Sequence, residues 1–338
     1  MKRMLIGISL LLATVAGVGV VSSRSQDGSD PQSADNAGPL THNWAGGNPL
    51  KIALLKWYQA NLTTSFPTPE DPWGVVFDGE NIWMCTNATG PDKVVKLRAS
   101  DGANLGTFDV GFGAMGMAFD GANVWVANSL SNTVTKLRAS DGKVLGNFKT
   151  GGESPWFLAF DGKNIWVTNE GNEILSELSA ADGSVIATYP QKHGVAGIAF
   201  DGTYIWVSDF YSAVYRYKLD GKEAGTFQLG YHHPFSMAFD GGNMWVVNDG
   251  NGTVSKLRAS DGKVLGTFTV GNAGPAYGIA YDGQSIWISG ESAVVEMRPS
   301  DGKLLFQQHL LCCVGAVGFD GANIWVAGGS GRNVAYKM

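Results

Sequence analysis

"FDGANVWVAN", residues 119–128, occurs seven times in varied form along this chain of 338 residues. Each copy contains an Asp-Gly pair and, five residues after the aspartate, a tryptophan: Trp83, Trp125, Trp166, Trp206, Trp245, Trp287 and Trp325. A repeat of about 40 residues with two turn signals and four β-type segments is typical of one blade of a β-propeller. The sequence therefore predicts an all-β fold, a seven-bladed β-propeller of four-stranded antiparallel blades.

Four strands are expected in each copy, and in the second copy they cover residues 116–120, 123–128, 133–139 and 143–148. One Asp-Gly joins the first two strands, and another, within "RASDGK", joins the last two. Asp-Gly suits tight hairpins because glycine takes positive φ at no steric cost. The tryptophan on the second strand is expected to fill the space between neighbouring blades.

The seventh copy lacks an outer strand. The second Asp-Gly turn occurs only six times, and the chain ends in "RNVAYKM" after a third strand. "NLTTSFPTP" (61–69) resembles the outer-strand phrase "KVLGTFTVG" (263–271). We therefore expect a strand at about residues 61–66 to close the ring. Before it, Asn48, Pro49 and apolar residues at helical spacing predict a short helix over residues 49–60.

The N-terminal residues predict export. Lys2 and Arg3 precede an apolar run over residues 4–21, so residues 1–23 are expected to be a signal peptide or a membrane anchor. Residues 24–48 are polar and predict a disordered linker before the propeller of residues 49–338. The protein is expected outside the cytoplasm, secreted or periplasmic, touching a membrane only through an uncleaved N-terminal segment. A net charge of -6 argues against nucleic acid as a partner, and we expect a monomer.

The repeats resemble those of YVTN/NHL-type propellers. The phrases that carry the resemblance are "FDGANIWVA" (319–327), "TVSKLRASDGKVLGTFTVG" (253–271) and "SPWFLAFDGKNIWVTN" (154–169). The resemblance covers about residues 50–338 and implies a scaffold rather than a particular function, because one such fold carries many different sites.

Functional residues are expected where the copies differ. The loops that lead into the inner strands and those between second and third strands emerge on one face, here called the top face. The position five residues before each aspartate opens the inner strand at this face, and it holds Trp73, Met115, Trp156, Ala196, Phe235, Tyr277 and Gly315. These aromatic side chains would offer an apolar surface to a flat ligand at the channel mouth. Alternatively, they plug the channel.

Polar top-face residues form a second candidate set. The loops that lead into inner strands carry Glu153, His193, His232, His233 and His309, and the loops between second and third strands carry Glu170, Glu173, Asp209, Tyr211, Asp249, Glu291 and Arg332. A histidine flanked by carboxylates can act as general base and acid. Exposed loop residues of these types are more often only solvated.

The repeat design is also similar to the virginiamycin B lyase family of seven-bladed propellers. That resemblance implies catalytic histidines immediately before inner strands, nearby glutamates and a magnesium ion. Here the corresponding positions hold the aromatic and small residues given above, and His233 lies two residues before Phe235. Only Glu170 and Glu291 match the place of a family glutamate, four residues after the blade tryptophan. The lyase constellation is therefore not reproduced.

Three cysteines lie near the expected ring seam. Cys85 ends the second strand of the first copy, and Cys312 and Cys313 precede the seventh inner strand. In an oxidising compartment, a bond from Cys85 to either of the other two would lock the seam. With His309, the three thiols also contain the elements of a soft-metal site, although "HLLCC" is no standard ligand spacing. Unpaired cysteines are the simplest expectation, and the sequence requires no cofactor.

The sequence thus predicts an exported propeller that binds a small molecule or a protein through its top face, without catalysis. The alternative is a lyase or hydrolase that uses histidine and carboxylate groups at the channel mouth, with or without a divalent metal. A purely structural envelope component is a third hypothesis.

Overall fold

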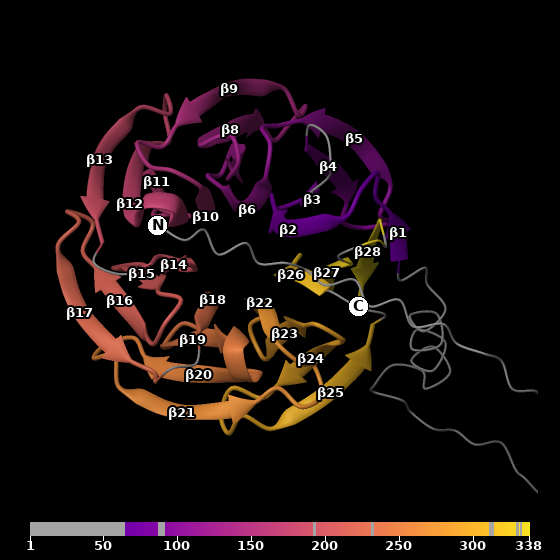
Figure 1. The fold of residues 1–338 in the computed structure, drawn as a ribbon. Helices are drawn as coiled ribbons and strands as arrows, with labels where there is room; N and C mark the ends of the chain where they lie inside the picture. The colour runs from indigo at the N-terminus through magenta and orange to yellow at the C-terminus, as the bar shows by residue number, and fades with distance from the viewer. Residues whose placement is uncertain are drawn as a thin grey trace, which may run out of the picture. The chain divides into compact units, whose positions relative to one another are not determined.

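Seven antiparallel sheets of four strands surround a central axis in the computed structural model (Figure 1). The structure describes residues 65–86, 92–191, 194–230, 233–310, 314–328, 331 and 333–338. The predicted seven-bladed propeller is therefore confirmed. The expected signal or anchor, linker and helix, residues 1–60, lie outside the described residues, and the described ranges contain no helix long and apolar enough to span a bilayer.

The strands of each blade follow one another outward from the axis. Blade 1 contains β2 (Pro72–Phe77), β3 (Asn81–Thr86), β4 (Lys93–Arg98) and β5 (Asn104–Asp109). Blade 2 contains β6 (Ala114–Phe119), β7 (Asn123–Asn128), β8 (Thr133–Arg138) and β9 (Val144–Lys149). Blade 3 contains β10 (Pro155–Phe160), β11 (Asn164–Asn169), β12 (Ile174–Ser179) and β13 (Val185–Pro190), with the 3-10 turn η1 (Glu170–Asn172) after β11. Blade 4 contains β14 (Ile198–Phe200), β15 (Ile205–Ser208), β16 (Ala213–Tyr217) and β17 (Glu223–Gln228).

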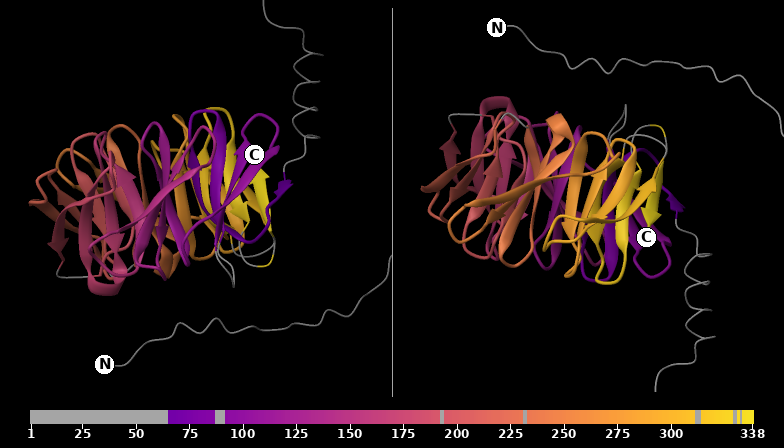
Figure 2. Two further views of the ribbon diagram at one scale, coloured as in Figure 1. Left: turned by 90° about the horizontal axis from the view of Figure 1, so that it is seen from above. Right: turned by 90° about the horizontal axis from the view of Figure 1, so that it is seen from below.

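The remaining three blades follow the same order. Blade 5 contains β18 (Pro234–Phe239), β19 (Asn243–Asn248), β20 (Thr253–Arg258) and β21 (Val264–Thr269), with η2 (Asp249–Asn251) after β19. Blade 6 contains β22 (Ala276–Tyr281), β23 (Ile286–Gly290), β24 (Ala293–Met297) and β25 (Leu304–His309). Blade 7 contains β26 (Val314–Phe319), β27 (Ile324–Gly328), β28 (Val334–Lys337) and β1 (Ser65–Pro67). Seen from the side, the blades stand next to one another with loops at both faces (Figure 2).

Blade 7 joins the two ends of the propeller. β1 pairs antiparallel with β28 and supplies its outer strand, with Phe66 opposite Ala335. The Phe66 ring stacks on Trp325 at a centroid distance of 5.4 Å, as Phe108 of blade 1 lies 5.7 Å from Trp83. The predicted closure by an N-terminal strand is thus confirmed. The observed strand begins at Ser65, and residues 61–64 lie outside the described residues.

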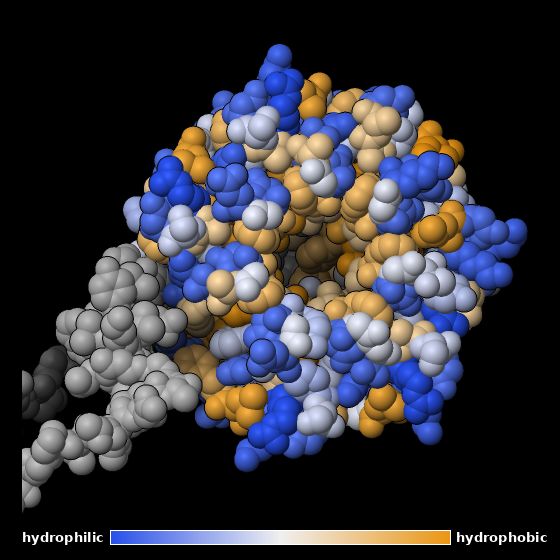
Figure 3. Space-filling view, turned by 180° about the vertical axis from the view of Figure 1, so that it is seen from behind, coloured by the Kyte–Doolittle hydropathy of each residue, from blue (hydrophilic) through white to orange (hydrophobic). Residues whose placement is uncertain are grey.

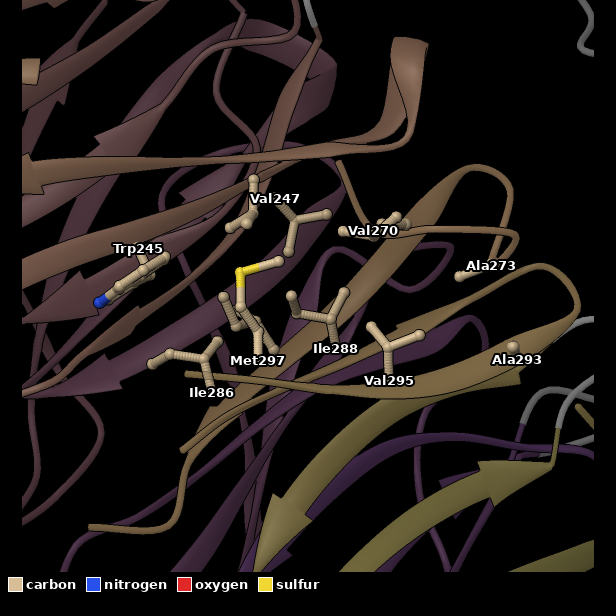
Figure 4. Packing of buried hydrophobic residues seen from close by; sticks show 12 residues of the cluster. Trp245, Val247, Val270, Ala273, Ile286, Ile288, Ala293, Val295 and Met297 are labelled. Carbon is tan, nitrogen blue, oxygen red and sulfur yellow. The ribbon is translucent and has the colours of Figure 1, made fainter. Parts of the chain in front are cut away.

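The repeated tryptophans hold neighbouring blades together. Every indole Nε1 donates a hydrogen bond of 2.7–2.8 Å to the aspartate five residues earlier, as Trp125 does to Asp120. The ring then packs against the next blade, and Figure 4 shows Trp245 of blade 5 beside Ile286 and Met297 of blade 6. Truncating a buried aromatic ring typically costs about 3–5 kcal/mol. The shared aspartate therefore serves both the hairpin and the contact between blades.

A basic residue on the third strand makes a second contact between blades. Lys136 Nζ lies 4.8 Å from the centre of the Trp125 ring and donates to the carbonyl of Ala180 in the next blade. The same double contact is made by Lys96, Arg216, Lys256 and Lys337. Blades 3 and 6 carry Glu177 and Glu296 instead.

The glycine of the outer Asp-Gly turn is required by the same packing. Gly142 has φ of 74°, and a Cβ there would lie 1.9 Å from the Phe108 ring of the preceding blade. An L side chain is disfavoured by the positive φ and excluded by the ring. Since Phe66 occupies the same place against Gly102, the closing strand reproduces an ordinary contact between blades.

Candidate functional site

The inner strands bring the predicted aromatic residues together around the axis. Trp73, Met115, Phe235 and Tyr277 contribute to the lining of a central cavity of about 190 Å³. From behind, the ring is hollowed at its centre, with hydrophobic residues around the opening (Figure 3). Trp73 of blade 1 and Tyr277 of blade 6 lie 6.4 Å apart, although blade 7 stands between them. The blade 7 residue at this position is Gly315, which has no side chain.

A second aromatic group lies on the side of blades 3 to 5. Trp156, Phe157, Phe210 and Phe235 have ring centroids 5.1–6.4 Å apart, most of them edge to face. Ala196 of blade 4 is fully buried at the corresponding position. Here again a small residue stands between two blades that carry large rings.

Phe157 and Phe210 were not predicted from the sequence, although a signal for each exists. At the position of Phe157 the other copies have glycine, alanine or serine. Phe210 follows its blade tryptophan by four residues, where the other copies are polar or glycine. Both are departures from the repeat, and comparing every position among the seven copies would have found them.

The aromatic side chains at the channel mouth differ in their exposure. Phe235 is 8% exposed, so its ring belongs mainly to the packing around the channel. Trp73, Trp156 and Tyr277 are only partly buried. Packing of aromatic pairs contributes about 0.5–1.5 kcal/mol each beyond area burial. The mouth is therefore partly filled by its own side chains and keeps accessible ring surface.

The polar candidates fall into two separate sectors. In blade 3, Glu153 and Glu170 lie on adjoining loops, where the carbonyl of Glu153 accepts a hydrogen bond from Gly171 at 3.0 Å. In blade 5, the carbonyl of His233 accepts a hydrogen bond of 3.0 Å from the backbone N–H of Asp249. His193 and His232 lie outside the described residues. The described residues contain no group of three or more His, Cys, Asp or Glu side chains arranged to hold a metal ion.

Asp249 is the most perturbed carboxyl of the top face. Burial raises the pKa of Asp249 above its ordinary value, His233 opposes the shift and Glu291 adds to it. The three side chains are therefore close enough to interact electrostatically. A carboxyl with a raised pKa beside a histidine is a combination found in acid-base sites.

Asp209 has a structural role. Its Oδ1 accepts hydrogen bonds from the backbone N–H groups of Tyr211, Ser212 and Ala213, at 2.7–2.9 Å. The side chain is 2% exposed. It therefore shapes the loop that carries Phe210 and is not available to a ligand at the surface.

The interpretation of Cys85 and His309 needs correction. Cys85 is a buried free thiol that donates to the carbonyl of Met115 in blade 2 at 3.0 Å, so it points away from the seam with blade 7. Burial raises the pKa of Cys85 to about 12, so the thiol stays protonated. A seam disulfide from Cys85 is therefore wrong. His309 is the exposed last residue of β25 and not part of a loop; Cys312 and Cys313 lie outside the described residues.

Comparison with solved structures identifies lyases of the same architecture. The propeller superimposes on virginiamycin B lyase from Staphylococcus aureus with a TM-score of 0.67 and 16% identity, covering 81% of this chain and 97% of that one. A streptogramin B lyase gives a TM-score of 0.67 and 17% identity, covering 81% and 94%. Such identities show a shared fold. No family model and no curated protein sequence matches the chain, so the resemblance to YVTN/NHL-type repeats stays a prediction.

Proposed function

We propose that the propeller is a binding scaffold whose top face takes a small molecule or a protein segment at the channel mouth. The observation that carries this proposal is the partly exposed ring pair Trp73 and Tyr277 on the lining of the central cavity. Ring faces of this kind favour a flat, largely apolar ligand. Because the closed ring holds the loops of seven blades in a fixed relation, binding costs little conformational entropy.

A fluorescence titration with N-phenyl-1-naphthylamine, a flat and uncharged probe, tests this proposal. Replacing both rings, in the variant Trp73→Ala/Tyr277→Ala, removes two contacts of about 0.5–1.5 kcal/mol each. Probe affinity should therefore fall about tenfold. Leu145→Ala is the matched control, because Leu145 is an exposed apolar residue (40%) on the outer strand of blade 2. Lost stability with unchanged probe affinity would show that the rings only plug the channel.

The second candidate function is catalysis at the blade 5 sector of the top face. It is favoured by the raised pKa of Asp249 beside His233 and Glu291, and by the fold shared with the two lyases. Incubation of the full chain with virginiamycin B and Mg²⁺, followed by mass spectrometry, distinguishes the two functions. Binding alone predicts no conversion, whereas conversion that Asp249→Asn abolishes would establish the enzyme.

Export is part of the proposal. It is supported by Lys2 and Arg3 before the apolar run of residues 4–21. Fractionation of the host cells, with N-terminal sequencing of the mature protein, should find the protein outside the cytoplasm. A cytoplasmic protein with an intact N-terminus would contradict it.

A further inference from the structure

A groove of about 520 Å³ lies between blades 3 and 4, away from the central cavity. One side is the end of β13, including Thr188, Tyr189 and Gln191, and the other is formed by β16 and β17 of blade 4, including Tyr215 and Tyr217. The volume is within the range of small-molecule sites, roughly 300–1,000 Å³. None of these residues belongs to the channel mouth.

The groove is lined by departures from the repeat. Tyr189 stands where five of the other six outer strands carry phenylalanine, namely Phe66, Phe108, Phe148, Phe227 and Phe268, whereas blade 6 carries Gln308. Gln191 stands where the other copies bury Thr68, Val110, Thr150, Leu229, Val270 and Leu310. These two positions, which pack blades elsewhere, are therefore more polar here than in most other copies.

β16 carries the other two changes. Tyr217 pairs with Ile205 in blade 4. The corresponding residue in blade 3 is Leu178, which pairs with Ile165. Tyr215 replaces the serine, threonine or valine of blades 1 to 3, 5 and 6, and only blade 7 has a tyrosine at this position, Tyr336.

The substituted side chains form hydrogen bonds with one another. The Tyr217 hydroxyl donates to Gln191 Oε1, and Gln191 Nε2 donates to the Tyr189 carbonyl at 2.8 Å. The Tyr189 hydroxyl donates to Glu177 at 3.0 Å, in the blade that lacks the usual basic residue. Burial raises the pKa of Tyr189 and of Tyr215 to about 12. The hydroxyls therefore stay protonated. Tyr189 donates its one proton to Glu177 and Tyr215 donates its proton to Asp209 at 3.3 Å, so toward a ligand these oxygens can accept.

The residues that line the groove indicate which class of ligand it can bind. The polar groove residues are tyrosines, glutamines, threonines and one carboxylate, Glu223, and the described lining also contains proline, glycine and valine. An anion would be repelled by the Glu223 carboxylate. A cation cage needs open aromatic faces, but the Tyr189 face stacks on Trp166 at 5.6 Å and Tyr217 is 4% exposed. Neutral donors and acceptors in a concave site suit a ligand that carries several hydroxyl groups.

We propose that the groove between blades 3 and 4 binds a neutral saccharide. The Tyr215 hydroxyl and the amides of Gln191 and Gln228 would pair with sugar hydroxyls, and Thr188 and Thr226 would complete the polar wall. The buried Tyr217 would hold Gln191 in position through its hydroxyl. This site is independent of the proposed function of the channel mouth, since the two share no lining residue.

Titration calorimetry of the full chain with maltose, cellobiose and N,N′-diacetylchitobiose tests the proposal. At least one of these probes should bind at millimolar concentration or below. The variant Gln191→Leu/Tyr217→Leu introduces the residues that blades 4 and 5 carry at these positions, Leu229 and Leu257, and it should weaken binding at least tenfold. Tyr215→Thr should weaken it similarly.

Two controls keep the outcome interpretable. Tyr336→Thr changes the matching tyrosine of blade 7 and should leave saccharide binding unchanged. Because the double variant follows the repeat, it should unfold at the same or a higher temperature, so that lost binding cannot be ascribed to lost folding. The proposal is overturned if no saccharide probe binds, if binding survives both groove variants, or if choline chloride binds in preference to all three sugars.

Discussion

Removing the Phe66 side chain should open the ring at its seam. The ring packs on Trp325 of blade 7 and against Gly102 of blade 1. Truncation of a fully buried phenylalanine costs about 3–5 kcal/mol, and Phe66 is only partly buried, so we expect about 2–3 kcal/mol from packing. β1 has three residue pairs with β28, whereas β5 has five with β4. Phe66→Ala should therefore detach the whole closing strand.

Phe108→Ala is the matched control, since Phe108 makes the same contact from a longer strand in the middle of the chain. Urea unfolding should show that both variants are destabilised. Hydrogen exchange measured by mass spectrometry should show lost protection in β28 for Phe66→Ala, and retained protection in β4 for Phe108→Ala. Equal protection of β28 and β4 in the two variants would refute the view that closure depends on this one ring.

Three further predictions concern the contacts inside and between blades. Lys136→Met should lower the free energy of unfolding by about 1–3 kcal/mol, because it removes the cation over Trp125 and leaves a carbonyl without its donor; urea unfolding against the exposed Lys143→Met checks this. Burial alone would raise the pKa of Asp120, but hydrogen bonds from Trp125, Asn123 and backbone N–H groups hold it below the ordinary value. A lowered folded-state pKa stabilises the protein above the unfolded pKa, about 3.9, and this stability is lost as pH falls through the folded value. Urea midpoints should therefore fall below about pH 4, and less so in Asp120→Asn. Native Cys85 should resist iodoacetamide, and Cys85→Ser should stay within about 1 kcal/mol of the parent, because serine offers the same donor to the Met115 carbonyl.

The fold could be predicted from sequence because its main contacts are local or repeated. An aspartate and the tryptophan five residues later lie on one hairpin, and seven copies make that pattern unmistakable. The closing strand was predicted from a single phrase, and in the structure its Phe66 stacks on Trp325. The basic residue over five of the rings was missed, because its partner carbonyl lies about one repeat away in the next blade.

The candidate site was only partly predictable from the sequence, because its contacts are neither local nor repeated. Which rings meet at the channel mouth depends on contacts across blades, as Trp73 of blade 1 and Tyr277 of blade 6 show. No pairing rule along the chain contains that information. For Cys85 the expected unpaired thiol was right, and the alternative of a seam disulfide was wrong because the side chain turns toward blade 2. Side-chain direction across the ring follows from the pairing register, which the repeat phrases alone do not specify.

A repeated fold also supplies its own reference for function. Positions that hold the same type of residue in most copies show what packing between blades requires. A copy that has a polar residue where the others bury an apolar one departs from that requirement. Gln191 does so where Leu229 and Val270 are buried, and burying such a side chain is worth about 1.5–3 kcal/mol. Polar residues that join into a hydrogen-bonded group, as Gln191 and Tyr217 do, recover part of this cost. Selection for packing alone gives no reason for the exchange, whereas selection for a ligand does. The groove between blades 3 and 4 therefore carries a stronger mark of function than the aromatic channel mouth, where the same rings also stabilise the fold.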